Sequence, residues 1–312
     1  MSTETFYTLI SRNKRNSWIL IIVFTLFFIG LGLLIGAVWG GGQAAFSITV
    51  AVVAAVIAFI ITLASYYGGP SLLLSMSRAR EITHDDDPQL FNVVEELSIA
   101  GGMPMPRVFI IDEPAMNAFA TGRNPQNAAV AITSGLRTRL KRDELQGVMA
   151  HELSHVRNYD ILFSMLVAVM VGVIVMMCDV FLRSMWWGGG RRSRSREREG
   201  GGGGIQIIFM VVALVLAIIA PILAKVIEMA LSRQREYMAD AGSVELTRNP
   251  QGLIGALEKL AGDQEVLQVA NRATAGLYFV HPIKRFEGGQ SSMFDSHPAI
   301  QDRIARIQSL TV

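Results

Sequence analysis

The hydrophobic and polar positions divide the chain into long apolar stretches and segments of mixed composition. No charged residue occurs between residues 16 and 77. Since one membrane span takes about 20 helical residues, we predict spans at about 18–38 and 45–67. The sequence Gly-Gly-Gly-Gln at 40–43 predicts the turn between them, because glycines break a helix and let the backbone reverse. The run is much longer than the apolar region of a cleaved signal peptide, which is about 7–15 residues.

Two more apolar stretches follow at 161–178 and 205–224, with a glycine- and arginine-rich linker between them. We predict a second hairpin whose linker is a solvated, flexible loop or contacts anionic lipid. A nucleic-acid-binding arm is not expected, because no aromatic residues are interspersed among the arginines. The chain is thus predicted to have four parts: a transmembrane hairpin (1–77), the first half of a soluble domain (78–160), a second hydrophobic hairpin with a Gly/Arg-rich loop at 183–204 (161–230), and the second half of the soluble domain (231–312).

Basic residues flank the first hairpin on both sides. Arg12, Lys14 and Arg15 precede it, and Arg78 and Arg80 follow it. Because positive charges tend to stay on the cytoplasmic side of a membrane, both ends of the hairpin are predicted to lie in the cytoplasm. The soluble domain that follows is then expected to face the cytoplasm as well.

The soluble segments contain both helical and strand patterns. Apolar periodicity and charged stretches predict helices at 88–101, 142–158, 233–245, 251–261 and 298–310. Short apolar runs predict strands at 107–111 and 128–132, and residues 117–122 could add a third strand at an edge. The predicted class is α+β, mainly helical with a small β-sheet, together with membrane helices in two hairpins.

Composition supports a membrane protein. Hydrophobic residues make up 51% of the chain, charged residues only 17%, and the mean hydropathy is +0.38. An ordinary soluble domain carries about 25% charged residues, so the composition argues against a wholly soluble or disordered chain. A net charge of +2 gives no reason to expect nucleic acid as a partner. The single cysteine, Cys178, excludes an internal disulfide framework and a cysteine-based zinc finger.

One pattern carries recognisable chemistry. His151, Glu152 and His155 form an HExxH sequence inside the predicted helix 142–158. Residues four apart in a helix lie on one face, so both imidazoles can bind the same zinc ion. Glu152 lies at the edge of that face, where it can accept a proton from the attacking water. The pattern arises by chance in about 1% of chains of this length, and the apolar stripe beside it favours a buried metal helix.

A catalytic zinc needs a third protein ligand, which without a usable cysteine must be His, Asp or Glu. The candidate is Glu236, and Asp240 one turn further on can accept the second N–H of a liganding histidine. Because Glu236 must reach the same ion as the histidines, the chain between them crosses the membrane zero or two times. Two crossings fit the lengths of the apolar stretches, although they place the linker arginines outside, against the positive-inside tendency.

The segments HELSH, SRQREYMAD and SHPAIQDRI, with apolar hairpins around them, resemble the HtpX-type membrane metalloproteases. These are bacterial and archaeal relatives of the prenyl-protein (CAAX) endopeptidases, and the resemblance covers essentially the whole chain. It implies a zincin-like metalloprotease domain with one zinc ion per subunit in a multi-pass protein of the plasma membrane. It also implies a zinc endopeptidase whose partners are the lipid bilayer and damaged or misfolded membrane proteins, in membrane quality control under stress.

The resemblance implies roles for individual residues as well. The zinc ligands would be His151, His155 and Glu236, with Asp240 as hydrogen-bond partner. Glu152 would be the general base, and His297 and Arg303 match residues that face the transition state. The residues that match a substrate-aligning edge strand are Asn117, Ala118, Phe119 and Ala120.

Three other functions remain as alternatives. A CAAX-type processing protease acts on prenylated C-termini and would need a host that prenylates proteins, which the sequence of this chain does not show. A catalytically silent membrane scaffold has no need of an intact Glu152. A metal transporter would carry His, Asp or Glu within its spans, and the first predicted pair of spans has none.

Overall fold

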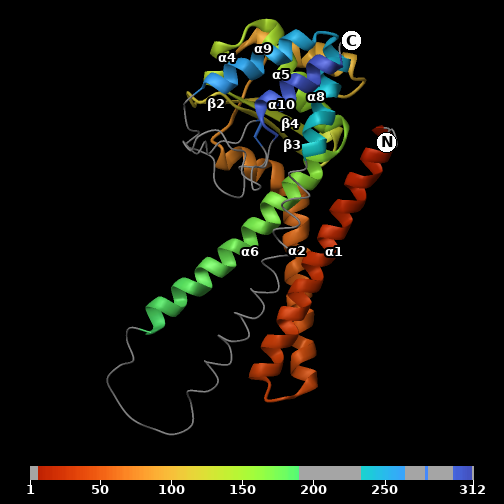
Figure 1. The fold of residues 1–312 in the computed structure, drawn as a ribbon. Coiled ribbons are helices and arrows are strands. Elements are labelled where there is room, and N and C mark those ends of the chain that lie inside the picture. The colour runs from red at the N-terminus through yellow and green to blue at the C-terminus, as the bar shows by residue number, and fades with distance from the viewer. Residues whose placement is uncertain (1–5, 190–232, 264–277, 280–297, 311–312) are drawn as a thin grey trace. The chain divides into compact units, whose positions relative to one another are not determined.

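The computed structural model describes residues 6–189, 233–263, 278–279 and 298–310 (Figure 1). The chain divides into two compact units, and each is described here by itself. The larger unit consists of Met1–Ser17, Tyr66–Ala168 and Glu228–Val312. The smaller unit consists of Trp18–Ser65 and Val169–Ile227.

Three long apolar helices are the candidate membrane spans of the described residues. They are α1 (Phe6–Trp39), α2 (Ala44–Met76) and α6 (Asp160–Gly189). The first two confirm the predicted N-terminal hairpin, and α6 confirms a helix in the third apolar stretch. Residues 183–189, predicted to begin the loop, instead continue α6; residues 183–187 contain no glycine that would break the helix. The apolar stretch 205–224 lies outside the described residues.

Within the smaller unit, α1 and α2 pack closely through small residues. A methyl group added at Gly36 would stand 2.5 Å from the Cα of Ser47, and one at Gly32 would stand 2.8 Å from the Cα of Ala51. Such close approach is typical of helix pairs in membranes, where small side chains let the backbones meet. The connecting turn has positive φ at Gly41 and Gly42, which confirms the glycine-rich reversal.

The larger unit contains a four-stranded mixed sheet. Its strands are β1 (Arg80–Glu81), β2 (Arg107–Ile111), β3 (Ala118–Gly122) and β4 (Ala128–Thr133). Their order is β1-β2-β4-β3; β2 and β4 are parallel, and the other two pairs are antiparallel. Both predicted central strands are confirmed, and the third lies at an edge as expected. The two-residue β1 was not predicted, because so short a strand leaves no alternating pattern.

Helix α5 is the centre of the soluble core. The other helices of this unit are α3 (Pro88–Ala100), α4 (Ser134–Arg139), α8 (Arg233–Thr247), α9 (Pro250–Gly262) and α10 (Ile300–Ser309). Helix α5 (Arg142–Arg157) packs against α3, α8 and α9 (Figure 1). Gly147 allows this, because a methyl group there would stand 2.6 Å from the backbone nitrogen of Leu253 on α9. The α+β, mainly helical class is confirmed; α4 is the helix that the sequence did not predict.

Candidate metal centre

The HExxH residues lie on a well-formed helix. The backbone N–H of Lys141 donates to the Glu144 carboxylate at 2.6 Å, which satisfies the start of α5. Apolar residues on the inner face of α5 are fully buried, among them Leu145, Val148 and Leu153. This packing fixes the helix so that His151 is fully buried and His155 is only partly exposed.

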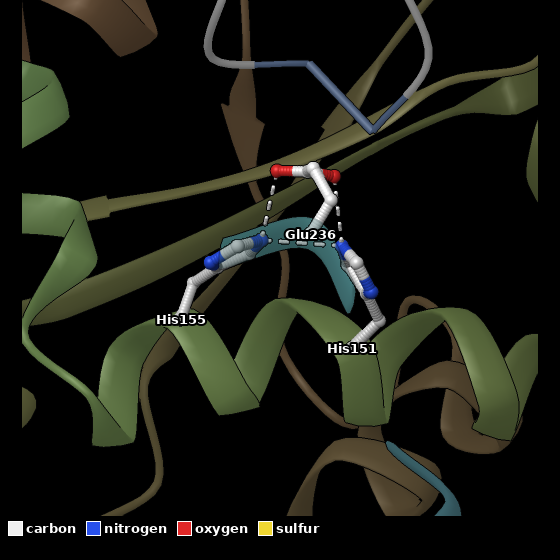
Figure 2. A group of neighbouring side chains, drawn as sticks. All are labelled: His151, His155 and Glu236. Carbon is white, nitrogen blue, oxygen red and sulfur yellow. Dashed lines mark hydrogen bonds and ion pairs between the residues drawn. The ribbon is translucent and has the colours of Figure 1, made fainter. Parts of the chain in front are cut away.

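Three side chains converge on one point (Figure 2). The Nε2 atoms of His151 and His155 are 3.1 Å apart. The carboxylate of Glu236, on α8, lies across both rings, with Oε2 3.6 Å from Nε2 of His151 and Oε1 3.7 Å from Nε2 of His155. Together these residues form a group of potential ligand atoms within 4.8 Å of one another. The structure therefore brings together the three metal ligands suggested by the sequence.

The spacing of these atoms fits a single metal ion. Tetrahedral ligands at about 2.0–2.1 Å from a zinc ion lie about 3.3 Å from one another. The separations of 3.1, 3.6 and 3.7 Å bracket this value. Two histidine nitrogens and a carboxylate are also a ligand set found in zinc enzymes, and such a set leaves the fourth position for water or substrate.

The first histidine is oriented by a buried carboxylate. Nδ1 of His151 lies 2.9 Å from Oδ1 of Asp240, so its N–H donates to the carboxylate and Nε2 is left to bind a metal. The guanidinium of Arg303 holds Asp240 in turn, through Nε at 3.0 Å and Nη2 at 2.6 Å. Burial tends to raise the pKa of Asp240, but the charge of Arg303 and the hydrogen bond from His151 hold that pKa below its ordinary value.

The second histidine has a carboxylate partner that the sequence analysis missed. Nδ1 of His155 lies 3.1 Å from Oδ2 of Asp160, the first residue of α6. The intervening turn includes Tyr159 with a φ of 59°, which folds the chain back toward the histidine. The sequence feature that could have identified Asp160 is its position, just after the metal helix and before an apolar stretch.

Burial and charge set the protonation of the site. Burial raises the pKa of Glu152 above its ordinary value, because the carboxylate is desolvated. Burial alone would lower the pKa of His155, but the hydrogen bond to Asp160 and the charge of Glu236 raise it to about 9. The negative potential that holds a proton on His155 also favours a metal cation.

Of the two residues matched to the transition state, the structure describes Arg303. Arg303 is buried, donates to Asp240 and to the carbonyl of Phe279, and stacks on the Phe279 ring. In this arrangement it holds Asp240, its Nη2 also lies 3.3 Å from Nδ1 of His151, and a direct role toward substrate stays a prediction. His297 lies outside the described residues.

The predicted substrate edge is partly covered. Asn117 pairs inward, where its carbonyl accepts from the N–H of Thr133. The carbonyl of Ala118 faces outward and accepts from the N–H of Phe279 at 2.8 Å. Since strand backbone groups alternate in direction, Ala120 is the next position whose N–H and C=O face away from β4. The expected open edge over 117–120 is therefore wrong at Ala118, where the chain occupies it itself.

A helix that carries HExxH, with a glutamate from a second helix facing both histidines, is characteristic of metalloproteases. Comparisons with known proteins agree, since the sequence profile of "Peptidase family M48" matches residues 84–311. The chain belongs to this family and is a metalloprotease with apolar helices suited to a membrane.

Relatives of similar length support this membership. "Protease HtpX homolog" of Ligilactobacillus salivarius is 43% identical over 307 residues, covering 97% of this chain and 99% of the relative. The protein of the same name from Lactobacillus acidophilus is 44% identical over 310 residues, with the same coverage. That from Dictyoglomus thermophilum is 42% identical over 310 residues, covering 99% of this chain and 96% of the relative. These bacterial relatives and the apolar helices indicate a bacterial membrane protein, in line with the resemblance.

A more distant similarity is to a solved structure, "Crystal Structure of S. mikatae Ste24p". Its TM-score is 0.46 at 18% sequence identity. The alignment covers 81% of this chain and 57% of that longer chain.

Proposed function

We propose that the chain is an integral-membrane zinc endopeptidase that cleaves damaged or misfolded membrane proteins. One observation carries the zinc assignment: the Nδ1 of each histidine is directed to an aspartate, so both Nε2 atoms face each other and the Glu236 carboxylate. Groups of this kind at this separation need a cation between them. A zinc ion that displaces the proton from His155 is bound by all three.

Glu152 is proposed as the general base. Zinc, when bound, polarises the scissile carbonyl and lowers the pKa of its water to about 7. The carboxylate of Glu152 accepts the proton of the attacking water and passes it to the leaving amine. Its raised pKa supports this role, because a carboxylate whose pKa lies closer to neutrality returns the proton more readily.

Metal removal is expected to abolish cleavage. A chelator should stop digestion of a model membrane protein, and added zinc should restore it. Glu236→Gln removes the anionic ligand, so zinc affinity should fall by more than the roughly 10–100-fold typical of losing a ligand's hydrogen-bond partner. Excess zinc should partly restore this variant. Metal content and digestion are measured together, with the exposed Glu245→Gln on the same helix as control. Full activity in metal-free protein would contradict the proposal.

The substrate backbone is proposed to add to the outer side of β3. Edge addition uses main-chain hydrogen bonds and reads few side chains, which supports broad cleavage of unfolded or flexible segments. Ala120 is the position that carries this proposal, because its N–H faces away from β4, while its side chain packs in the core.

Ala120→Pro tests the substrate edge. Proline lacks the N–H and fixes φ, so cleavage should fall while zinc stays bound. Ala120→Ser keeps the backbone N–H and serves as control for the altered side chain. Cleavage rate and zinc content are measured on all three proteins. If the proline variant cleaves at the wild-type rate, the substrate does not pair at this edge.

The protease unit is proposed to face the cytoplasm. The basic residues around the first hairpin support this orientation through the positive-inside tendency. If the second hydrophobic pair spans the membrane, Ser195 in its linker lies outside, and a cysteine placed there should react with an impermeant thiol reagent in intact cells. Protection until lysis would show that the pair does not cross.

A further inference from the structure

The two liganding histidines are held by carboxylates from different parts of the chain. Asp240, on α8, accepts from His151, and Asp160, at the start of α6, accepts from His155. Asp240 is fixed by the guanidinium of Arg303. Asp160 needs a comparable partner, because a carboxylate that rotates about its own bond does not fix the ring that donates to it.

Asn13 supplies that partner. Its Nδ2 donates to Oδ1 of Asp160 and, at 2.9 Å, to the backbone carbonyl of Asn158. Asn13 is 1% exposed and Asp160 is 5% exposed, so water does not compete for these contacts. The two oxygens of Asp160 are thereby divided: Oδ1 is held by Asn13, with Nε of the buried Arg235 at 3.9 Å, and Oδ2 is left facing His155.

We propose that Asn13 and Asp160 are positioning residues for the metal ligand His155, and that the N-terminal segment of α1 is therefore part of the metal centre. This inference rests on the proposed zinc site. The same segment makes a second contact with the turn after the metal helix, since Nζ of Lys14 lies 4.2 Å from the ring centre of Tyr159. Met1–Ser17 also belongs to the larger unit, together with the metal helix.

The geometry gives each residue a distinct task. Asp160 fixes the tautomer and plane of the His155 ring, so that Nε2 points toward Nε2 of His151. Asn13 fixes the rotation of the Asp160 carboxylate and, through the Asn158 carbonyl, the turn that carries it. A helix that only packed against the domain would contribute stability but would not set the direction of a ligand's lone pair.

The test measures metal binding on the full-length protein in detergent. Asp160→Asn should weaken zinc binding about 10–100-fold in a chelator competition. Asn13→Leu, which keeps the approximate volume, should weaken it less, by about tenfold. The control is Ser17→Ala, since Ser17 is buried one turn further along α1 and its hydroxyl donates within that helix, to the carbonyl of Asn13. It should bind zinc like the wild type.

Cobalt substitution separates positioning from stability. The visible absorption bands of the bound cobalt report ligand geometry, and they should shift in Asp160→Asn and Asn13→Leu but not in Ser17→Ala. Thermal unfolding of the metal-free proteins shows which variants remain folded. If Asp160→Asn fails to fold, Asn13→Leu still carries the test. Wild-type affinity and spectra in the folded variants would overturn the inference alone, whereas wild-type protein that binds no zinc would overturn the proposed function with it.

Discussion

Glu152→Gln is expected to abolish peptide hydrolysis while zinc remains bound. Glutamine has nearly the same size and still forms hydrogen bonds, but it cannot accept the proton of the attacking water. General acid–base catalysis is typically worth about 10²–10⁴-fold in rate, and the loss should fall in this range or above it. The metal ligands His151, His155 and Glu236 are unchanged, so zinc content should match the wild type.

The measurement for this variant is the digestion rate of a membrane protein substrate, with zinc content determined on the same preparation. Glu258→Gln makes the same chemical change at an exposed position on α9 and should leave both quantities unchanged. Hydrolysis by Glu152→Gln at the wild-type rate would rule out the assigned general base. Loss of zinc from this variant would assign Glu152 to metal binding instead.

Arg303→Met is expected to destabilise the protease unit strongly. Arg303 is 1% exposed and is the cation that pairs with the buried Asp240. Removing one partner of a buried ion pair typically costs about 3–5 kcal/mol, because the remaining charge is left without compensation in a low-dielectric interior. Since Asp240 also orients His151, zinc affinity should fall in the same variant.

Arg306→Met is the matched control for this prediction. Arg306 lies on the same helix, is exposed, and stacks on Tyr237 at 4.5 Å. Its loss should cost no more than about 1 kcal/mol, as is usual for exposed cation–π contacts. Denaturant unfolding in detergent compares the two variants. Equal midpoints for Arg303→Met and wild type would contradict the structural role of the buried pair.

The features visible in the sequence are those with a local signature. HExxH fixes two ligands by helical spacing alone, and uncharged stretches show where apolar helices lie. Both kinds of pattern predicted helices that the structure confirms, among them the first hairpin and helix α5. The third candidate ligand was proposed because a zinc site needs one, and Glu236 followed by Asp240 had the right chemistry one turn apart.

Other parts of the site depend on tertiary contacts and left no local signal. Asp160 reaches His155 only because the turn at Tyr159 folds back, and Asn13 comes from the far end of the sequence. Arg303 lies on a helix with other charged residues, so the sequence alone gave no sign that its side chain is buried. The cover at Ala118 arises from Phe279, which no pattern in the sequence links to β3.

The order of the ligands along the chain has a consequence for biosynthesis. His151 and His155 leave the ribosome first, and Glu236 follows only after α6 and the residues up to 232 have been made. A nascent protein that is still inserting its apolar helices therefore has two of its three metal ligands. Proteolytic capacity arises late, once α8 has docked on α5. The emerging chain, itself an unfolded membrane protein of the kind it is proposed to cleave, therefore cannot cleave itself before Glu236 has been made.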